Sequence, residues 1–274
     1  MSWLSRTELL IGPEGLDTLH RAHVLVVGLG GVGSFAAEFI ARSGVGEMTI
    51  VDGDVVDPSN RNRQLPALSS THGQSKAELM AARLLDINPE LKLHVRQDFL
   101  TPEAARAILD EPFDYVMDCI DSVTPKLTLL ETAFKRGFRI VSSMGAGGKL
   151  DPTKIEVSEL FETRECFLAY YVRKRLRRLD VGRGIKAVFS TETVRVESLM
   201  HTDGSNFKRS AYGTMSYLPA TFGATCASVV IRDLLGEPIP DFEASEARAR
   251  RKKQLERKKV MRAIDIKRRK QAGE

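Results

Sequence analysis

Glycines and a carboxylate near the start of the chain form the pattern with the clearest chemical meaning. Gly28, Gly30 and Gly33 have the spacing of a phosphate-binding turn, which follows an apolar run and precedes an amphipathic segment. Without side chains in the turn, backbone N–H groups and the amino end of the next helix can approach an anion closely. Asp52 follows the next apolar run, where a carboxylate can accept hydrogen bonds from ribose hydroxyls. Together these residues predict a nucleotide site.

The residues after Asp52 indicate which nucleotide is bound. An NAD site needs nothing particular beyond its ribose carboxylate, but here the chain continues with a second acid and a charged turn that contain Asp54, Asn60, Arg63 and Gln64. These side chains suit a triphosphate and its metal better than a neutral nicotinamide ring. We therefore expect ATP, and an NAD-dependent dehydrogenase is the less favoured alternative.

Two further candidates lie at the ends of predicted elements. Ser75 and Glu78 have the spacing of a capping box, so Lys76 opens a helix, where a cation opposes the helix dipole by about 0.3–1 kcal/mol. Either an anion compensates Lys76 or it is a solvated lysine. Asp121 follows a predicted strand, at the carboxyl end where open α/β sheets bind ligands. Asp118 is expected to form a turn and is given no catalytic role.

Alternating strands and helices must position these residues. Strands are predicted near 24–28, 47–52, 92–97, 113–118 and 138–142, with helices near 32–43, 75–86, 102–110 and 124–136. This alternation predicts an α/β fold with a Rossmann-like, doubly wound, mostly parallel sheet. Residues 155–157, 185–190 and 193–197 are predicted as strands outside that repeat, and 218–235 as a terminal apolar helix. We expect a catalytic domain over 1–237, with this additional strand and helix region, and a basic tail over 238–274 that is helical or disordered.

The order of the motifs resembles the ThiF-type adenylating superfamily, which includes ubiquitin-activating and molybdopterin-synthase-activating enzymes. The resemblance depends on G-x-G-G-x-G, which adds Gly31 to the loop, and on D-x-D-x-V-x-x-S-N-x-x-R-Q after it. It implies that ATP binds at the glycine loop, with Asp52 on the ribose and Mg²⁺ on Asp121. The other implied roles are phosphate binding by Asn60, Arg63 and Lys76, and support of the loop by Gln64.

The amino-terminal segment resembles the R-[FY]-x-R opening of the same superfamily, with Trp3 in place of the first arginine. Arg6 matches the second arginine, which in relatives reaches the ATP of the partner subunit. The resemblance implies a homodimer in which Arg6 acts in trans. A surface arginine on an N-terminal helix is the alternative.

The carboxyl half resembles one branch, the tRNA threonylcarbamoyladenosine dehydratases. The resemblance depends on S-S-M-G-A-G-G-K-L-D-P-T at 142–153, a basic run at 172–178, V-F-S-T-E at 188–192 and G-T-M-S at 213–216. These enzymes use ATP to activate the carboxylate of the modified tRNA adenosine, which then cyclises with loss of water. An activator of a ubiquitin-like or sulfur-carrier protein, with a sulfur-transfer partner, is the second hypothesis. A non-catalytic nucleotide-binding RNA adaptor is the third.

Positive charge is concentrated in two places that could contact RNA. Residues 244–274 hold 13 Lys/Arg and 4 Asp/Glu, whereas the whole chain has a formal net charge of +5, so the rest is net acidic. This tail is either solvated or adds phosphate contacts through counterion release. Within the catalytic domain, a cluster better placed for tRNA consists of Arg173, Lys174, Arg175, Arg177 and Arg178. A solvated helix face is its alternative.

The remaining chemistry-bearing residues suggest little. Cys119, Cys166 and Cys226 are an odd number without metal-ligand spacing, so we expect a reducing cytoplasm and no disulfide framework. Cys166 has polar sequence neighbours, including Arg164, and a nucleophilic role is a minor alternative. The five histidines form no ligand motif and are given no function. No apolar run approaches the ~20 residues of a membrane helix, so no membrane association is expected.

Overall fold

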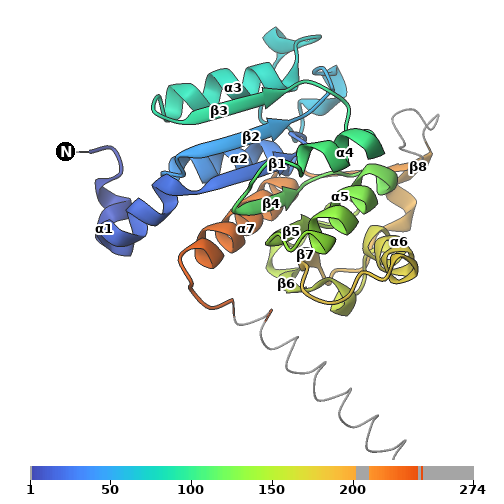
Figure 1. Ribbon diagram of the computed structural model, residues 1–274. Helices are drawn as coiled ribbons and strands as arrows, with labels where there is room; N and C mark the ends of the chain where they lie inside the picture. Colours follow the sequence, from blue (N-terminus) through green and yellow to red (C-terminus); the bar gives the residue numbers. More distant parts are fainter. Residues whose placement is uncertain (1, 202–209, 240–241, 243–274) are drawn as a thin grey trace, which may run out of the picture.

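A mixed sheet forms the centre of the computed structural model, which describes residues 2–201, 210–239 and 242 (Figure 1). In this sheet the strand order is β3-β2-β1-β4-β5-β7-β6. All neighbours pair in parallel except β6, which runs antiparallel to β7. The strands are β1 (His23–Val27), β2 (Glu47–Val51), β3 (Lys92–Arg96), β4 (Tyr115–Asp118), β5 (Ile140–Ser143), β6 (Ile155–Glu159) and β7 (Lys186–Ser190). A separate antiparallel pair consists of β8 (Leu199–His201) and β9 (Ser210–Tyr212).

Helices cover both faces of the sheet. They are α1 (Ser5–Arg21), α2 (Gly33–Arg42), α3 (Lys76–Ile87), α4 (Pro102–Ile108), α5 (Val123–Lys135), α6 (Phe167–Leu176) and α7 (Tyr217–Leu234). Short 3-10 turns are η1 (Pro58–Asn60), η2 (Ser69–Thr71), η3 (Pro152–Lys154), η4 (Leu160–Glu162), η5 (Arg177–Leu179) and η6 (Val196–Ser198). Within the described ranges, no helix has the length and apolar character needed to cross a membrane.

The two faces of the sheet belong to two hydrophobic cores, because successive side chains of a strand point to opposite sides. Val24 and Val26 of β1 pack with residues of α2, α3 and α7, whereas Leu25 and Val27 pack with residues of α4, α5 and α6. This double covering is what a doubly wound fold requires, and it confirms the predicted fold class.

The turn between β1 and α2 depends on two glycines. Gly28 has a φ of 89°, in the region that favours glycine. A Cβ on Gly33 would lie 1.7 Å from the carbonyl oxygen of Gly28, so α2 could not start this close to β1 with any other residue there. The predicted glycine spacing thus has a direct steric cause.

The second half of the chain agrees with the prediction in one respect and differs from it in another. Strands were predicted at 155–157 and 185–190, and β6 and β7 lie there, both in the main sheet, with β6 antiparallel. Residues 193–197 do not form the predicted strand, and β8 begins only at Leu199. The carboxylate of Glu192 accepts the N–H groups of Leu150 (2.8 Å) and Asp151 (2.7 Å), which turns this segment toward a neighbouring loop. Of the predicted tail, only residues 238, 239 and 242 fall inside the described ranges.

Candidate active site

A cavity of about 640 Å³ opens at the carboxyl ends of the parallel strands β1, β2 and β4. Most of the residues predicted to bind ATP line it: Gly28, Gly30, Gly31, Asp52, Asp54, Asn60, Arg63, Gln64, Lys76 and Asp121. Gly33 is absent from the lining because it is buried under the glycine turn, against Gly28. The fold therefore brings together residues that are spread over about a third of the sequence.

Several helices begin at this cavity. Its lining includes Val32, which precedes α2, Lys76, which opens α3, and Ser122, which precedes α5. The amino end of a helix carries partial positive charge and N–H groups without helical partners. Such ends at one cavity favour a ligand with several negative charges, as a triphosphate has.

Asp52 lies directly after β2 and is fixed by the backbone around it. One carboxylate oxygen accepts the N–H of Leu29 (2.6 Å), and the other accepts the N–H of Asp54 (2.8 Å). Burial raises the pKa of Asp52, and this effect outweighs the opposing attraction of Lys76. The carboxylate thus has a defined orientation at the cavity wall.

Lys76 has the anionic partner that its place at a helix start led us to expect. Its Nζ lies 3.0 Å from Oδ2 of Asp54, and its backbone N–H is bonded to the carbonyl oxygen of the same residue (3.1 Å). The Lys76 side chain is 5% exposed, whereas that of Asp54 is 44% exposed. The lysine is therefore held in place with its ammonium group at the cavity.

The charged turn after Asp54 forms η1 and the residues that follow it. Asp57 caps η1, with the side chain of Asn60 accepting the N–H of Asp57 in return (3.2 Å). Arg63 donates from Nη1 to the carbonyl oxygen of Ser59 and to Oδ1 of Asn62, both at 2.9 Å. These bonds orient a guanidinium at the rim of the cavity.

A buried ion pair supports the loop that carries Asp121. Nζ of Lys126 lies 2.5 Å from Oδ2 of Asp118, and both side chains are fully buried. Lys126 also donates to Oγ of Ser142 (3.2 Å) and to the carbonyl oxygen of Ser143 (3.0 Å). Oδ1 of Asp118 accepts the N–H of Ile120 (3.1 Å), which is the expected turn. Asp118 therefore has a structural place, and exposed Asp121 lies three residues further on, at the cavity.

Sequence reasoning missed part of the cavity wall. Asp98, Phe99 and Leu100 follow the edge strand β3 and line the cavity, with Phe99 50% exposed. An exposed aromatic ring in the cavity lining provides an apolar wall of the kind an adenine base needs. Only its position after a predicted strand could have drawn attention to Phe99.

Another part of the cavity wall comes from the carboxyl half of the chain. Its lining consists of residues 143–147 after β5, with Leu168 of α6, Thr214 and Pro219. Lys149 anchors this side, because its buried ammonium group donates to the carbonyl oxygens of Glu165 (3.0 Å), Ser190 (2.8 Å) and Glu192. One cavity thus has two parts: a nucleotide half from the first part of the chain and a second half from the carboxyl part of the chain.

The cysteines have packing positions. Cys166 is buried, in contrast to the polar setting that its sequence neighbours indicated, and its sulfur accepts the N–H of Ala169 at the start of α6. Burial raises the pKa of the Cys119 thiol well above its ordinary value and that of Cys226 to about 12. The two thiols with raised pKa values are poor nucleophiles at neutral pH.

The predicted RNA cluster lies on α6 and η5, and Arg6 lies apart from the cavity on α1. Lys174, Arg175, Arg177 and Arg178 are exposed, whereas Arg173 is half-buried and donates to Oγ1 of Thr163. The guanidinium of Arg177 lies over the ring of Phe161, 5.2 Å from its centre. Arg6 is exposed and does not line the cavity of its own chain.

Comparisons with known proteins agree with this geometry. The ThiF family model matches residues 4–272. The tRNA threonylcarbamoyladenosine dehydratase of Bacillus subtilis (strain 168) is 41% identical over 238 residues, covering 84% of this chain and 94% of that protein. The crystal structure of E. coli tRNA N6-threonylcarbamoyladenosine dehydratase, TcdA, in complex with ATP has a TM-score of 0.77 at 37% identity and covers 85% of this chain and 93% of that one.

The complex of E. coli TcdA with AMP is equally similar, with a TM-score of 0.76 at 36% identity, covering 84% of this chain and 93% of that one. The family model spans nearly the whole chain, and the relatives are matched over almost their full length. The chain therefore belongs to the ThiF family, in its branch of tRNA threonylcarbamoyladenosine dehydratases.

Proposed function

We propose that this chain uses ATP to adenylate the carboxylate of threonylcarbamoyladenosine in tRNA and then promotes cyclisation of that side chain, with release of pyrophosphate and AMP. The observation that carries the proposal is a single cavity with two different halves. One half has the glycine turn, Asp52 and Lys76, and the other is built from the segments that resemble the dehydratase branch. ATP and AMP complexes of the E. coli relative support the nucleotide half.

Two steps account for the overall reaction. In the first, a carboxylate oxygen of the substrate attacks the α-phosphorus of ATP, and the bond to pyrophosphate breaks, leaving an acyl-adenylate. In the second, a group of the same side chain attacks the activated carbonyl carbon, and AMP leaves. The second step is intramolecular and needs no protein nucleophile, which fits the buried position of Cys166.

The protein's contribution is positioning and neutralisation of charge. Asp52, held by two backbone N–H groups, accepts hydrogen bonds from the ribose hydroxyls. Lys76 and Arg63 offset the negative charge that develops as pyrophosphate departs. Asn60 and the starts of α2, α3 and α5 add donors for the phosphates. Gln64 supports the glycine loop, because its Nε2 lies 3.7 Å from where a Cβ on Gly30 would be.

Asp121 is the residue we assign to Mg²⁺. Its carboxylate is exposed at the cavity, and Mg²⁺ in nucleotide sites is held by one or two carboxylates together with substrate phosphates and water. Bound there, Mg²⁺ would neutralise phosphate charge and polarise the phosphoryl oxygens.

A homodimer would complete the site with Arg6 of the partner subunit. Leu9 and Leu10, within a turn of Arg6 on α1, are 88% and 85% exposed. Two adjacent leucines this exposed form an apolar surface that a second copy can cover. Mixing Arg6→Ala protein with Lys76→Met protein under subunit exchange should restore activity, since each mixed dimer keeps one intact site. A mixture as inactive as its components would mean that the site is built within one chain, with no contribution from Arg6 of the partner.

The exposed face of α6 is suited to the tRNA. Phe167, Tyr170 and Tyr171 are each about half exposed, and the two tyrosine rings meet edge to face at 5.4 Å. Unpaired bases of an RNA loop stack on such rings, and a stacked base contributes about 1–3 kcal/mol. The cations Lys174 and Arg175 follow on the same helix, where they can contact phosphates. Because Leu168 of α6 lines the cavity, a loop bound here lies next to the cavity.

Mass analysis of nucleosides tests the proposal directly. The substrate is tRNA that carries threonylcarbamoyladenosine, incubated with the protein, ATP and Mg²⁺. Conversion of that nucleoside to the product is followed by mass, and AMP is quantified in parallel. We expect the nucleoside to lose one water in step with AMP formation. ATP–pyrophosphate exchange that requires a protein ending in Gly-Gly would instead support the activator of a ubiquitin-like or sulfur-carrier protein. ATP binding without turnover would support an RNA adaptor.

A further inference from the structure

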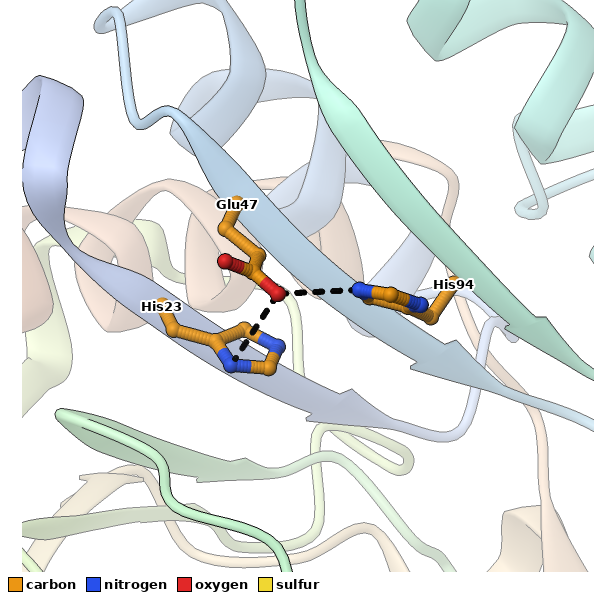
Figure 2. A group of neighbouring side chains, drawn as sticks. All are labelled: His23, Glu47 and His94. Carbon is orange, nitrogen blue, oxygen red and sulfur yellow. Dashed lines mark hydrogen bonds and ion pairs between the residues drawn. The ribbon is translucent and has the colours of Figure 1, made fainter.

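Three side chains of the metal-ligating types meet at the other end of the sheet from the cavity (Figure 2). His23 begins β1, Glu47 begins β2, and His94 is the third residue of β3. In the parallel register His23 lies opposite Glu47, and Thr49 lies opposite His94. Since Glu47 and Thr49 are two residues apart, all four side chains point to the same face of the sheet.

The distances are those of a site that a small cation could complete. Oε1 of Glu47 lies 2.9 Å from Nε2 of His94 and 3.6 Å from Nδ1 of His23. One ligand atom from each residue lies within 4.8 Å of the other two. Tetrahedral Zn²⁺ with bonds near 2.05 Å separates its ligand atoms by about 3.4 Å. The two measured separations bracket that value, so small side-chain movements suffice.

Neighbouring groups hold His23 in the required orientation. Its Nε2 lies 2.9 Å from Oγ1 of Thr49, and its ring packs against Phe113 with 4.6 Å between ring centres. Its backbone N–H donates to Oδ2 of Asp114 (2.8 Å). In the tautomer whose Nε2–H donates to this hydroxyl, Nδ1 is unprotonated and faces Glu47, as a metal ligand requires. Such a bond from the second nitrogen is the usual way in which a protein orients a metal-binding imidazole.

The cluster is also accessible. The side chains of His23, Glu47 and His94 are 14%, 27% and 38% exposed, and His23 and Glu47 line an open hollow of about 650 Å³. An ion can therefore enter without unfolding the strands.

One cation already competes for the same oxygen. Nζ of Lys92 lies 2.8 Å from Oε1 of Glu47, but the Lys92 side chain is 66% exposed and can turn into solvent. The acids on the wall of the hollow include Asp110 and Glu111, which bind Arg136 (2.7 Å) and Arg96 (2.9 Å). Lys92 is thus the group whose removal should favour a metal most.

We propose that His23, Glu47 and His94 form a Zn²⁺ site, with water as the fourth ligand. Two imidazoles and one carboxylate are a donor set that suits Zn²⁺ and is poor for Mg²⁺ or Ca²⁺, which prefer oxygen ligands only. The ion would join three adjacent strands, including the edge strand β3. Its role is structural and does not depend on the proposed function, since none of the three residues lines the ATP cavity.

Calorimetry and thermal unfolding test the site in the full-length chain, stripped with EDTA and titrated with ZnCl₂. We expect one ion per chain, and at a hundredfold excess of free Zn²⁺ over Kd a rise in Tm of roughly 5–10 °C. His94→Ala should weaken binding by about a hundredfold, while His72→Ala, which changes an exposed histidine elsewhere, should leave it unchanged.

Lys92→Gln makes the test independent of folding defects, because it should strengthen Zn²⁺ binding by removing a competing cation. Circular dichroism and ATP affinity of the metal-free proteins verify that each variant is folded. The proposal is overturned if the wild-type chain binds no Zn²⁺, or if folded His94→Ala binds it as tightly as His72→Ala. It is also overturned if Lys92→Gln weakens binding.

Discussion

The two ends of β2 carry carboxylates with opposite properties. Glu47, the first residue of the strand, bonds to Lys92 and His94, and these hydrogen bonds outweigh burial and lower its pKa. Asp52, the residue after the strand, is more deeply buried, and burial raises its pKa despite Lys76. Side chains of the protein compensate the negative charge of Glu47, whereas the negative charge of Asp52 is only partly compensated.

The polar groups at the amino ends of the strands find partners within the folded chain, whereas those at the carboxyl ends gain further partners from a ligand. At the carboxyl ends, Asp52 and the starts of several helices surround a cavity and gain partners when a nucleotide binds. At the amino ends, Glu47 already has cationic and imidazole partners, so an ion there would replace existing contacts. We therefore expect substitutions at the carboxyl ends to act mainly on catalysis, with one exception.

The exception is the buried pair of Lys126 and Asp118, which lies at the carboxyl end but contacts only protein groups. Lys126→Met should destabilise the fold by about 3–5 kcal/mol, because it leaves a carboxylate buried without its cation. Urea unfolding measures the loss. Lys135→Met, which removes an exposed lysine paired with Glu131, is the matched control and should cost less than about 1 kcal/mol.

If Lys126→Met were as stable as the control but inactive, the pair would belong to the reaction and not to the fold. The double variant Asp118→Leu/Lys126→Met sharpens the point. It removes both charges together and should regain much of the lost stability. No recovery would mean that the packing of these side chains, and not their charge, holds the loop with Asp121.

Lys76→Met should reduce AMP formation by about 10²–10³-fold, since it removes a fixed cation from the departing phosphates. Its stability should change little, because its partner Asp54 is 44% exposed and can be solvated. Single-turnover assays of AMP release measure the effect, and ATP binding shows whether the ground state is spared. Wild-type turnover in a folded Lys76→Met protein would remove Lys76 from the site.

The sequence predicted the carboxyl end of the sheet well because its determinants are contiguous. The glycine turn, the acid after β2 and the start of α3 each depend on residues within a few positions of one another, and the fold then brings them together. Phe99 was missed because nothing distinguishes an aromatic residue after an edge strand from an ordinary surface residue. Residues 193–197 do not form the predicted strand, because Glu192 just before them bonds to the backbone of Leu150 and Asp151, a contact that the local sequence does not show.

The amino end was not predictable from spacing. His23, Glu47 and His94 are far apart in the sequence and fit no ligand motif, so only the strand order and register place them side by side. The burial of Cys166 was likewise not evident from the sequence, because its sequence neighbours are polar. Local patterns therefore predict turns and helix starts, while contacts across strands require the sheet itself.

The tRNA surface extends the comparison beyond the sheet. Replacing Lys174, Arg175 and Arg178 by glutamine should weaken tRNA binding by roughly tenfold at moderate salt and leave ATP affinity unchanged. Each lost phosphate contact should flatten the slope of log affinity against log salt by about 0.7–0.9. Arg173 is left in place because it is half-buried against Thr163.

A triple replacement of cations on other helices controls for net charge. Arg21, Arg106 and Lys135 are similarly exposed and lie on α1, α4 and α5. An equal loss of tRNA affinity in both triple variants would show that overall charge, and not the α6 surface, determines binding.

The smallest expected effect is the pH dependence of stability in metal-free protein, which should have opposite signs for the carboxylates of Glu47 and Asp52. The pKa of Glu47 is lowered from an ordinary 4.5, so its contribution to stability is present above that pH and is lost as the pH falls through the folded-state pKa. The pKa of Asp52 is raised from 3.8, so its contribution is present below that pH and is lost as the pH rises through the folded-state pKa.

Urea unfolding from about pH 7 to about pH 4 should therefore give differences of opposite slope. The stability advantage of wild type over Glu47→Gln should shrink on acidification, whereas wild type should gain relative to Asp52→Asn. Each change should be below about 1 kcal/mol, since Glu47 is partly exposed and Asp52 keeps its backbone donors. Slopes of the same sign would mean that the two ends of β2 do not differ in how they hold charge.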